Sequence, residues 1–268
     1  MELRKPDTRS ATLPRSTDPL FYQRVSRPVA AMPKDFPAGA VVAPHCHERA
    51  QLLYAADGVM RVATSAGTWI VPPQRAVWIP LGVEHELLMI GAVAMRTLYI
   101  AADVAPGLPS TCTVVNVSPL LRELILAAME EPVEYAVDSR GAAIAALLLH
   151  EIAAIKTIAL HLPLPHDART AKACSLVLER IRDDVGLDDL ATAVGVSSRS
   201  LSRLFRRETG MSFQIWRQQA RLSEALVRLA AGQPIATVSA DLGYASSSAF
   251  ITMFKRMLGT TPGRYFRD

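Results

Sequence analysis

The sequence is poor in cysteine and contains no long hydrophobic run. Its three cysteines, Cys46, Cys112 and Cys174, are too scattered for a disulfide framework or a cysteine-rich zinc module. No apolar segment reaches the ~20 residues that a membrane-spanning helix needs. The opening residues are polar and lack the apolar stretch of a secretory signal. We therefore expect a cytoplasmic protein.

Acidic residues are scarce in the C-terminal part of the chain. Residues 197–268 hold 11 Lys and Arg against 4 Asp and Glu, whereas residues 1–164 hold 14 against 15. A concentrated basic excess attracts polyanions, nucleic acid above all, although a solvated surface can carry the same charge. The chain has 268 residues, more than a typical single domain, so two domains are expected.

Secondary-structure signals divide the chain into segments. Residues 1–20 are polar and proline-rich, as in a disordered arm. Residues 21–105 contain short β-like runs without intervening helices, which predicts an antiparallel barrel or sandwich. Within them, Asp57-Gly58 is a hairpin turn signal. If the other end of the chain binds DNA, as argued below, we expect residues 21–105 to form a sensor domain or an oligomerisation module.

Helical patterns begin near Ser118-Pro119, a typical helix cap with a first-turn proline. A second helix, roughly Arg140 to Leu160, is almost entirely apolar or small, which favours a subunit interface. We expect residues 118–161 to form a helical dimerisation and connector region. Residues 162–168 are predicted to be an interdomain linker, and residues 169–268 a helical domain.

The C-terminal segment contains an internal repeat. Residues 190–216 read LATAVGVSSRSLSRLFRRETGMSFQIW, and residues 238–265 read VSADLGYASSSAFITMFKRMLGTTPGRY. Gly195 aligns with Gly243, and the second turn is one residue longer than the first. Each copy has the pattern of a helix-turn-helix, in which a glycine ends the first helix and a serine caps the second. The expected core stripes are Leu201, Leu204 and Phe205 in the first copy, and Phe250, Met253 and Phe254 in the second.

The second helix of each copy is the expected recognition helix. Its N-terminal side chains reach base edges in the major groove, and its last residues meet phosphates. The first copy offers arginines, which suit guanine, so we expect it to contribute more base specificity than the hydroxyl-rich second copy. The expected DNA-contacting residues are Ser198, Arg199, Ser200, Ser202, Arg203, Arg206, Arg207, Ser246, Ser247, Ser248, Thr252, Lys255 and Arg256.

Residues 169–268 resemble the DNA-binding domain of the AraC/XylS family of bacterial transcription regulators. The motifs that carry the likeness are LATAVGVSSRSLSRLFRRETGMSFQIWRQQARLSEALVRL and PIATVSADLGYASSSAFITMFKRMLGTTPGRYFR. The resemblance implies that the two recognition helices enter successive major grooves on one face of the DNA, ~34 Å apart. The sequence departs from the family at Ala249 and Ile251, where larger or polar residues are frequent.

A histidine-rich stretch, APHCHERAQ, occupies residues 43–51. Alternate residues of a strand share a face, so His45 and His47 point one way, and Cys46 and Glu48 the other. Two spacings in this region resemble the motifs of the cupin superfamily, which implies a small antiparallel β-barrel with a central pocket. They are Gly39, His45, His47, Gln51 and Gly58, and then Pro80, Gly82, His85 and Met89.

Three interpretations of the histidines stay open. His45, His47 and His85 form a three-imidazole set suited to zinc, iron, nickel or copper. The same side chains suit a pocket that hydrogen-bonds a small-molecule effector, or a barrel interior without a ligand. Gln51 stands where a glutamate ligand is usual, which weakens a catalytic role, and no cofactor is required. The expected pocket residues are His45, His47, Gln51, Tyr54, Trp69, Trp78 and His85.

The expected fold class is therefore α+β with two domains, a cupin-like antiparallel β-barrel with following helices and an all-α tandem helix-turn-helix domain. The leading hypothesis is a homodimeric, sequence-specific transcription regulator, activator or repressor, that is not an enzyme. Its expected partners are double-stranded promoter or operator DNA, a small-molecule effector and RNA polymerase. The alternatives are a metal-dependent cupin enzyme with an appended DNA-binding domain, and an effector-free architectural DNA binder.

Overall fold

The computed structural model describes residues 16–104, 108–155, 157–158 and 160–266. Of the expected N-terminal arm, residues 1–15 lie outside this range, and the first helix begins at Pro19. The N-terminal elements are α1 (Pro19–Gln23), β1 (Val29–Phe36), β2 (Val41–His45), β3 (Ala50–Thr64), β4 (Gly67–Val71), β5 (Arg75–Ile79), β6 (His85–Ile100), η1 (Ala102–Val104), β7 (Thr113–Asn116), α2 (Pro119–Glu130), α3 (Arg140–Ala153), β8 (Thr157–Ile158) and β9 (His161–Pro163).

Among the described residues, nine strands form one sheet; its antiparallel pairing was predicted, whereas the predicted barrel is not closed. The strand order is β1-β6-β3-β5-β7-β8, with β2 added to β6, β4 to β3, and β9 to β4. The long strands β3 and β6 pair along most of their length and form the centre of the sheet. The sheet is curled but open, because β1 and β8 remain unpaired with each other in the described ranges. Its two faces pack against different partners.

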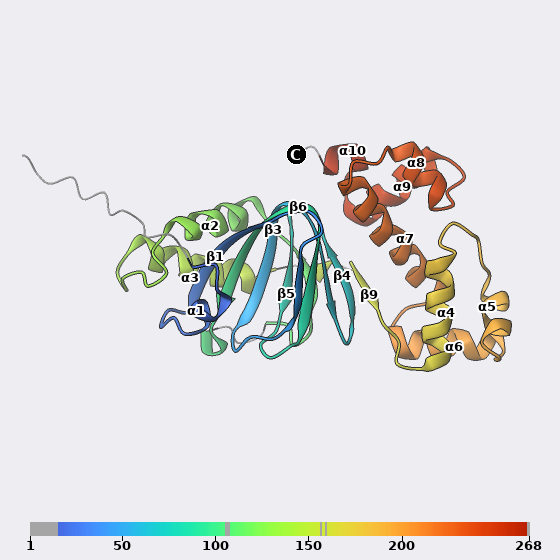
Figure 1. The fold of residues 1–268 in the computed structure, drawn as a ribbon, viewed down its shortest axis with the longest axis horizontal. Helices are drawn as coiled ribbons and strands as arrows, with labels where there is room; N and C mark the ends of the chain where they lie inside the picture. The colour runs from blue at the N-terminus through green and yellow to red at the C-terminus, as the bar shows by residue number, and fades with distance from the viewer. Residues whose placement is uncertain (1–15, 105–107, 156, 159, 267–268) are drawn as a thin grey trace, which may run out of the picture.

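Alternation along the strands separates these two faces. Leu53 and Val77 belong to a buried cluster on the inner face, whereas Leu52 and Trp78 belong to a second cluster that includes α2 and α3. Figure 1 shows α2 and α3 on the side of the sheet away from the C-terminal helices. The inner face therefore lies toward the C-terminal helices, and the outer face carries α2 and α3.

The predicted hairpin turn at Asp57-Gly58 is wrong, because β3 continues through it. The pairing of β3 with β6 shifts register on both sides of Asp57, which is the pattern of a β-bulge. Gly58 has a φ of 78°, and a Cβ built on it would lie 2.1 Å from the carbonyl oxygen of Ala92. A left-handed glycine suits a tight turn and a bulge equally, so the pairing with β6 decides between them.

Helix α2 begins as predicted, with the Ser118 side chain accepting from the backbone N–H of Leu121 and Pro119 in the first turn. Helix α3 ends at Ala153, earlier than the predicted Leu160. The chain beyond it forms β8, which pairs with β7, and β9, which pairs with β4. Open sheet edges supply backbone hydrogen bonds there, so an extended chain replaces the last helical turns and the start of the expected linker.

The C-terminal domain contains α4 (Ala168–Glu179), α5 (Leu187–Ala193), α6 (Ser198–Thr209), α7 (Phe213–Ala230), α8 (Ile235–Asp241), α9 (Ser247–Leu258) and α10 (Pro262–Tyr265). The predicted helix-turn-helix units are confirmed as α5–α6 and α8–α9. Ser197 and Ser246 cap the recognition helices, and Gly195 and Gly243 have φ values of 72° and 76°. Both predicted core stripes are buried. None of the described helices has the length and apolar character needed to cross a bilayer.

The C-terminal domain packs directly against the sheet. Helix α7 contacts β3, β4, β6 and β9. The backbone N–H of Leu164 donates to the Ala66 carbonyl at 3.3 Å, and the Trp216 indole N–H donates to the Pro163 carbonyl at 3.1 Å. The guanidinium of Arg75 lies over the ring of Tyr265, 5.7 Å from its centroid. The segment that connects the two domains is therefore held by hydrogen bonds to the sheet on one side and to α7 on the other.

The bond from Trp216 to Pro163 predicts the behaviour of a single substitution. Trp216→Phe keeps an aromatic ring in the core but leaves the Pro163 carbonyl without its donor, which costs about 1 kcal/mol. We expect that loss in urea unfolding, together with faster limited proteolysis between residues 160 and 170. Trp78→Phe is the matched control, because Trp78 donates to Pro109 at 2.8 Å within the N-terminal domain. Equal cleavage of the two variants in this segment would contradict the assignment.

Candidate functional site

The recognition helix α6 presents a row of exposed arginines. Arg199, Arg203 and Arg206 are exposed and form no ion pair with a described acidic residue. Arg207 differs, because its guanidinium lies 2.9 Å from the Glu208 carboxylate and 3.8 Å from that of Asp167. The first three arginines are thus available for a polyanion, while Arg207 also stabilises the fold.

The serines at the start of α6 make hydrogen bonds within the protein. The Ser197 hydroxyl accepts from the backbone N–H of Ser200 and donates to the Ser200 hydroxyl at 2.9 Å. Ser198 donates to the carboxylate of Asp188 in the first turn of α5. Ser202 is half-buried. These groups fix the N-terminal end of the recognition helix relative to α5.

The recognition helix α9 has a less charged surface. Ser246 caps the helix, and the hydroxyl of Ser247 lies 3.1 Å from that of Ser239 in α8. The exposed residues on this helix are Ser248, Ala249, Thr252, Lys255 and Arg256. Both cations lie in the last turn, where the helix dipole favours positive charge. The two recognition helices therefore differ in chemistry, although their folds repeat.

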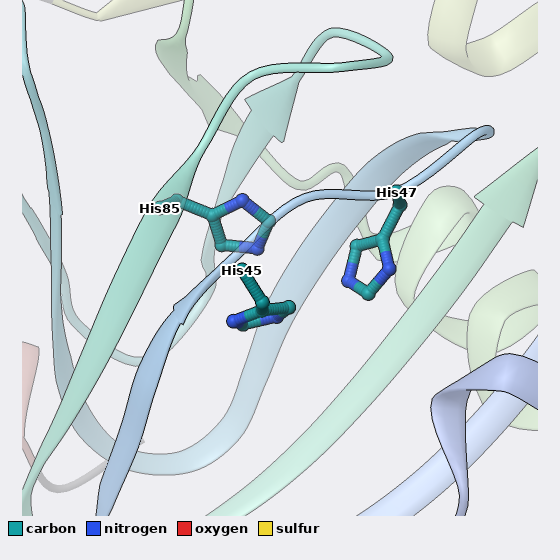
Figure 2. A group of neighbouring side chains, drawn as sticks. All are labelled: His45, His47 and His85. Atoms are coloured by element: carbon teal, nitrogen blue, oxygen red, sulfur yellow. The ribbon is translucent and has the colours of Figure 1, made fainter.

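Three histidines meet on the inner face of the sheet (Figure 2). His45 ends β2, His47 follows it, and His85 begins β6 opposite His45. One ring nitrogen from each lies within 4.8 Å of the others. The ring centroids of His45 and His85 are 4.3 Å apart, and those of His47 and His85 are 5.4 Å apart. The structure thus brings together the three side chains selected from the sequence.

Backbone carbonyls orient two of these imidazoles. The Nδ1 atom of His45 lies 2.8 Å from the Ala43 carbonyl, and that of His85 lies 2.9 Å from the Val83 carbonyl. Because a carbonyl only accepts, each Nδ1 carries a proton in these bonds, and each Nε2 is left to interact with another group. The Nε2 atoms of His47 and His85 are buried and have no partner among the described atoms. The cluster therefore presents unsatisfied nitrogen acceptors.

Burial keeps two of the histidines neutral. It lowers the pKa of His47 to about 4, with smaller contributions from the neighbouring His45 and His85. It also lowers the pKa of His85 to about 4, against a raising effect of the Val83 carbonyl. Both imidazoles are therefore unprotonated at neutral pH. A neutral imidazole can donate its Nε2 lone pair to a metal ion or accept a hydrogen bond there.

Gln51 and Tyr99 extend the cluster. Gln51 pairs across from Tyr99 on neighbouring strands, and both side chains are buried. The ring of Tyr99 lies 5.2 Å from that of His47, and burial raises its pKa. The Gln51 Oε1 atom is buried without a partner. Sequence reasoning missed Tyr99, because no local signal shows which residue of β6 faces Gln51.

Three aromatic residues predicted to line the pocket lie elsewhere. Tyr54 and Trp78 belong to the cluster with α2 and α3, since each is one residue out of phase with the inner-facing positions of its strand. Trp69 lies on the inner face but stacks on His161 of β9, with ring centroids 4.6 Å apart. The strand phase therefore removes Tyr54 and Trp78 from the histidine pocket. Cys46 and Glu48 are exposed, as alternation predicted.

Comparison with known proteins agrees with this architecture. An AraC-like ligand binding domain matches residues 35–179, and a helix-turn-helix domain matches residues 190–268. The HTH-type transcriptional regulator NimR of Escherichia coli is 36% identical over 221 residues, covering 82% of this chain and 81% of NimR. The arabinose operon regulatory protein of Escherichia coli is 33% identical over 121 residues, covering 44% of this chain and 40% of its own.

Among solved structures, fatty acid-bound ToxT from Vibrio cholerae aligns over 89% of this chain and 94% of the ToxT chain. The sequence identity is 14% and the TM-score is 0.38. The two domain matches and the NimR relationship span most of the sequence. They place the chain with regulators rather than with the metal-dependent enzymes considered as an alternative. The chain belongs to the AraC family of DNA-binding transcription regulators, with a ligand-binding domain that precedes two helix-turn-helix units.

Proposed function

We propose that this regulator reads operator DNA chiefly through α6, anchors itself on the DNA backbone through α9, and senses a ligand at the three histidines. The observation that carries the first part is the contrast between the two recognition helices. Helix α6 exposes Arg199, Arg203 and Arg206 without internal ion pairs, whereas the exposed cations of α9 lie only in its last turn. Since its DNA target lies in the cytoplasm of a bacterial cell, we infer that location and RNA polymerase as a further partner.

The chemistry of the side chains supports this division. An arginine fork can donate two hydrogen bonds to the O6 and N7 atoms of guanine, which distinguishes guanine from other bases. Lys255 and Arg256 in the last turn of α9 suit phosphate oxygens, which carry no sequence information. Ser248 and Thr252 offer hydroxyls and a methyl group, which discriminate less strongly. Other residues expected at the interface, among them Ser198 and Ser246, hold the helices in position instead.

The DNA prediction separates these roles by single substitutions. Arg203→Ala should relax the preference at one or two base positions and cost ~1–3 kcal/mol on the preferred sequence. Arg256→Ala should weaken binding to preferred and random duplexes by a similar factor and reduce the salt dependence of binding. The measurement is affinity for a selected duplex and for a scrambled duplex at several salt concentrations. Equal losses on both duplexes for Arg203→Ala would contradict a base-reading role.

The histidine cluster fits a divalent transition metal ion. Zinc, nickel, copper and iron accept neutral imidazole nitrogen, and a backbone hydrogen bond on the other ring nitrogen is the usual support for such a ligand. His45 and His85 have that support. His45, His47 and His85 would hold the ion, which would supply an open coordination position for an effector atom. Gln51 lies across from Tyr99, whose ring contacts His47, and has one buried oxygen without a partner.

A purely organic effector is the second candidate for this site. The unsatisfied Nε2 atoms of His47 and His85 would accept hydrogen bonds from its hydroxyl or N–H groups, and Gln51 Oε1 would accept another. Both candidates use the same side chains, so variants alone do not separate them. Direct measurement of bound metal does.

The metal prediction is tested on protein purified without a histidine tag. We expect one Zn²⁺ or Co²⁺ per chain by elemental analysis, with cobalt absorption in the visible range. His85→Ala should lower the metal affinity by more than ~100-fold, because it removes a ligand and not only a supporting group. His166→Ala is the control, since His166 is exposed and lies outside the cluster. Wild-type protein that binds neither ion would contradict the metal proposal and favour the organic effector.

We further infer a homodimer formed through α3. Ile144, Leu148 and Ile152 bury one side of this helix against the sheet. The opposite side is also almost wholly apolar, where a helix that meets only water is usually polar. Its exposed residues are Arg140 at the start of the helix, and then Ala143, Ala146, Leu147, His150 and Ala153, which are spaced as one helical stripe. Small residues allow two helices to approach closely, and a second copy of the same stripe is self-complementary.

The dimer prediction uses a charge placed on the stripe. Leu147 is 49% exposed, and Leu147→Glu should convert the protein to a monomer, since it would bring two carboxylates together at the interface. Val137→Glu is the matched control, because Val137 is 74% exposed but lies in the loop before α3. Sedimentation equilibrium or light scattering measures the mass of each. A wild-type protein that is monomeric at micromolar concentration would contradict the inference.

A further inference from the structure

The two helix-turn-helix units share α7 but have separate cores. Phe213, Trp216 and Ala220 belong to the first unit's buried cluster. Leu222 and Leu226 belong to the cluster that contains the core of the second unit. The change from one core to the other therefore falls at residue 221. A single helix can bend or twist at such a point unless other contacts cross it.

Arg221 bridges the two units at this point. Its Nε atom donates to the Ile181 carbonyl and its Nη2 atom to the Asp183 carbonyl, both at 3.1 Å. These carbonyls belong to the loop between α4 and α5 in the first unit. The same guanidinium lies over the ring of Tyr244 in the second unit, 5.8 Å from its centroid. One side chain from α7 thus holds parts of both units.

Gly243 brings the second unit into direct contact with the same loop. A Cβ built on Gly243 would lie 2.0 Å from the backbone oxygen of Arg182, so the two backbones touch there. Gly195 occupies the equivalent turn in the first unit with a similar φ, yet a Cβ built there has no atom within 4 Å. Both turns therefore need a left-handed backbone at the glycine, but the need for space beside it differs between the two copies. Only Gly243 also lies against the neighbouring unit.

The loop between α4 and α5 is itself held to the first half of α7. Arg217 donates to the carboxylate of Asp184 at 2.6 Å and to the carbonyl of Val185 at 3.2 Å. A movement of this loop would therefore carry the first unit with it. The contacts made by Arg221 and Gly243 consequently join two bodies rather than a body and a free loop.

We propose that these contacts, Ile181, Arg182 and Asp183 with Arg221, Gly243 and Tyr244 (the α7 seam), set the spacing between half-sites that the protein accepts. This inference rests on the proposed binding of DNA by both recognition helices. A rigid seam presents α6 and α9 at one separation and one relative rotation. Once the first unit is bound, the effective concentration of the second unit at its half-site is high at one spacing and lower at other spacings.

The geometry of DNA makes spacing a sensitive measure of that rigidity. One turn of the duplex takes 10–10.5 base pairs and ~34–36 Å, so one inserted base pair moves a half-site by ~3.4 Å and ~35°. A rigid pair of units must break contacts or distort the duplex to follow that movement. A loosened pair can follow it, but gives up part of its advantage at the natural spacing.

The experiment uses the full chain and a duplex selected by the wild-type protein from a random pool, with its half-sites mapped by footprinting. Affinity is measured for this duplex, for versions with one base pair added or removed between the half-sites, and for one half-site alone. Wild type should lose ~tenfold or more on the altered spacings, as for a disrupted base contact. Arg221→Gln and Gly243→Ala should bind the natural spacing ~tenfold more weakly and lose most of the preference for it.

Two matched controls separate spacing from stability. Gly195→Ala has the same left-handed backbone penalty but does not touch the other unit, so the spacing preference should stay at the wild-type value. Arg228→Gln removes an arginine of α7 that pairs with Glu224 and Asp241, away from the first unit, and should also keep it. The affinity of each seam variant for the α6 half-site alone should be unchanged.

The outcomes are distinguishable. Seam variants that keep the wild-type ratio between natural and altered spacings would overturn the inference. If Gly243→Ala unfolds the second unit by circular dichroism, Arg221→Gln carries the test, since it leaves the glycine turn intact. Wild-type protein that binds one half-site as tightly as two would overturn the proposed use of both helices, and the inference with it. That result is visible before any variant is made.

Discussion

Helix α7 packs against three hydrophobic surfaces, and the arrangement of the molecule depends on this. Its first half completes the core of α4, α5 and α6, and its second half belongs to the cluster that includes α8 and α9. It also contacts the sheet at β3, β4, β6 and β9. Helix–helix and helix–sheet packing at native density leaves little room for independent adjustment. A change at any one of these surfaces is therefore felt by the other two.

Neighbouring residues of a strand lie on opposite faces of the sheet and contact different parts of the protein. Gln51 and Leu53 lie on the inner face of the sheet, whereas Leu52 and Tyr54 belong to the cluster with α2 and α3. The inner face and the core of the second helix-turn-helix unit form one continuous cluster of buried residues. A ligand at the histidines thus lies on the face that meets the DNA-binding domain. It can shift DNA binding only by favouring one arrangement of that contact over another.

Short-range sequence patterns predicted those features of the fold that depend only on neighbouring residues. The cap at Ser118, the serine caps of the recognition helices, the turn glycines Gly195 and Gly243, and the core stripes of α6 and α9 all follow from a few neighbouring residues. Long-range pairing was not predictable in the same way. Three features depend on which strand pairs with which. They are the bulge at Gly58, the strand at His161–Pro163 and the contact between the rings of Tyr99 and His47. A one-residue change of phase moved Tyr54 and Trp78 to the opposite face.

The histidine cluster resembles a metal centre in its geometry but differs in its charge. The groups that would hold an ion there are three imidazoles, and Gln51 offers a neutral amide rather than a carboxylate. A carboxylate at that position would offset the charge of a divalent ion and strengthen its binding. Without it, an ion held at this site would be bound more weakly and would exchange more readily, because neutral donors alone would have to repay the desolvation of the ion. Ready exchange limits a catalytic centre, but a sensor requires it, since occupancy must follow concentration.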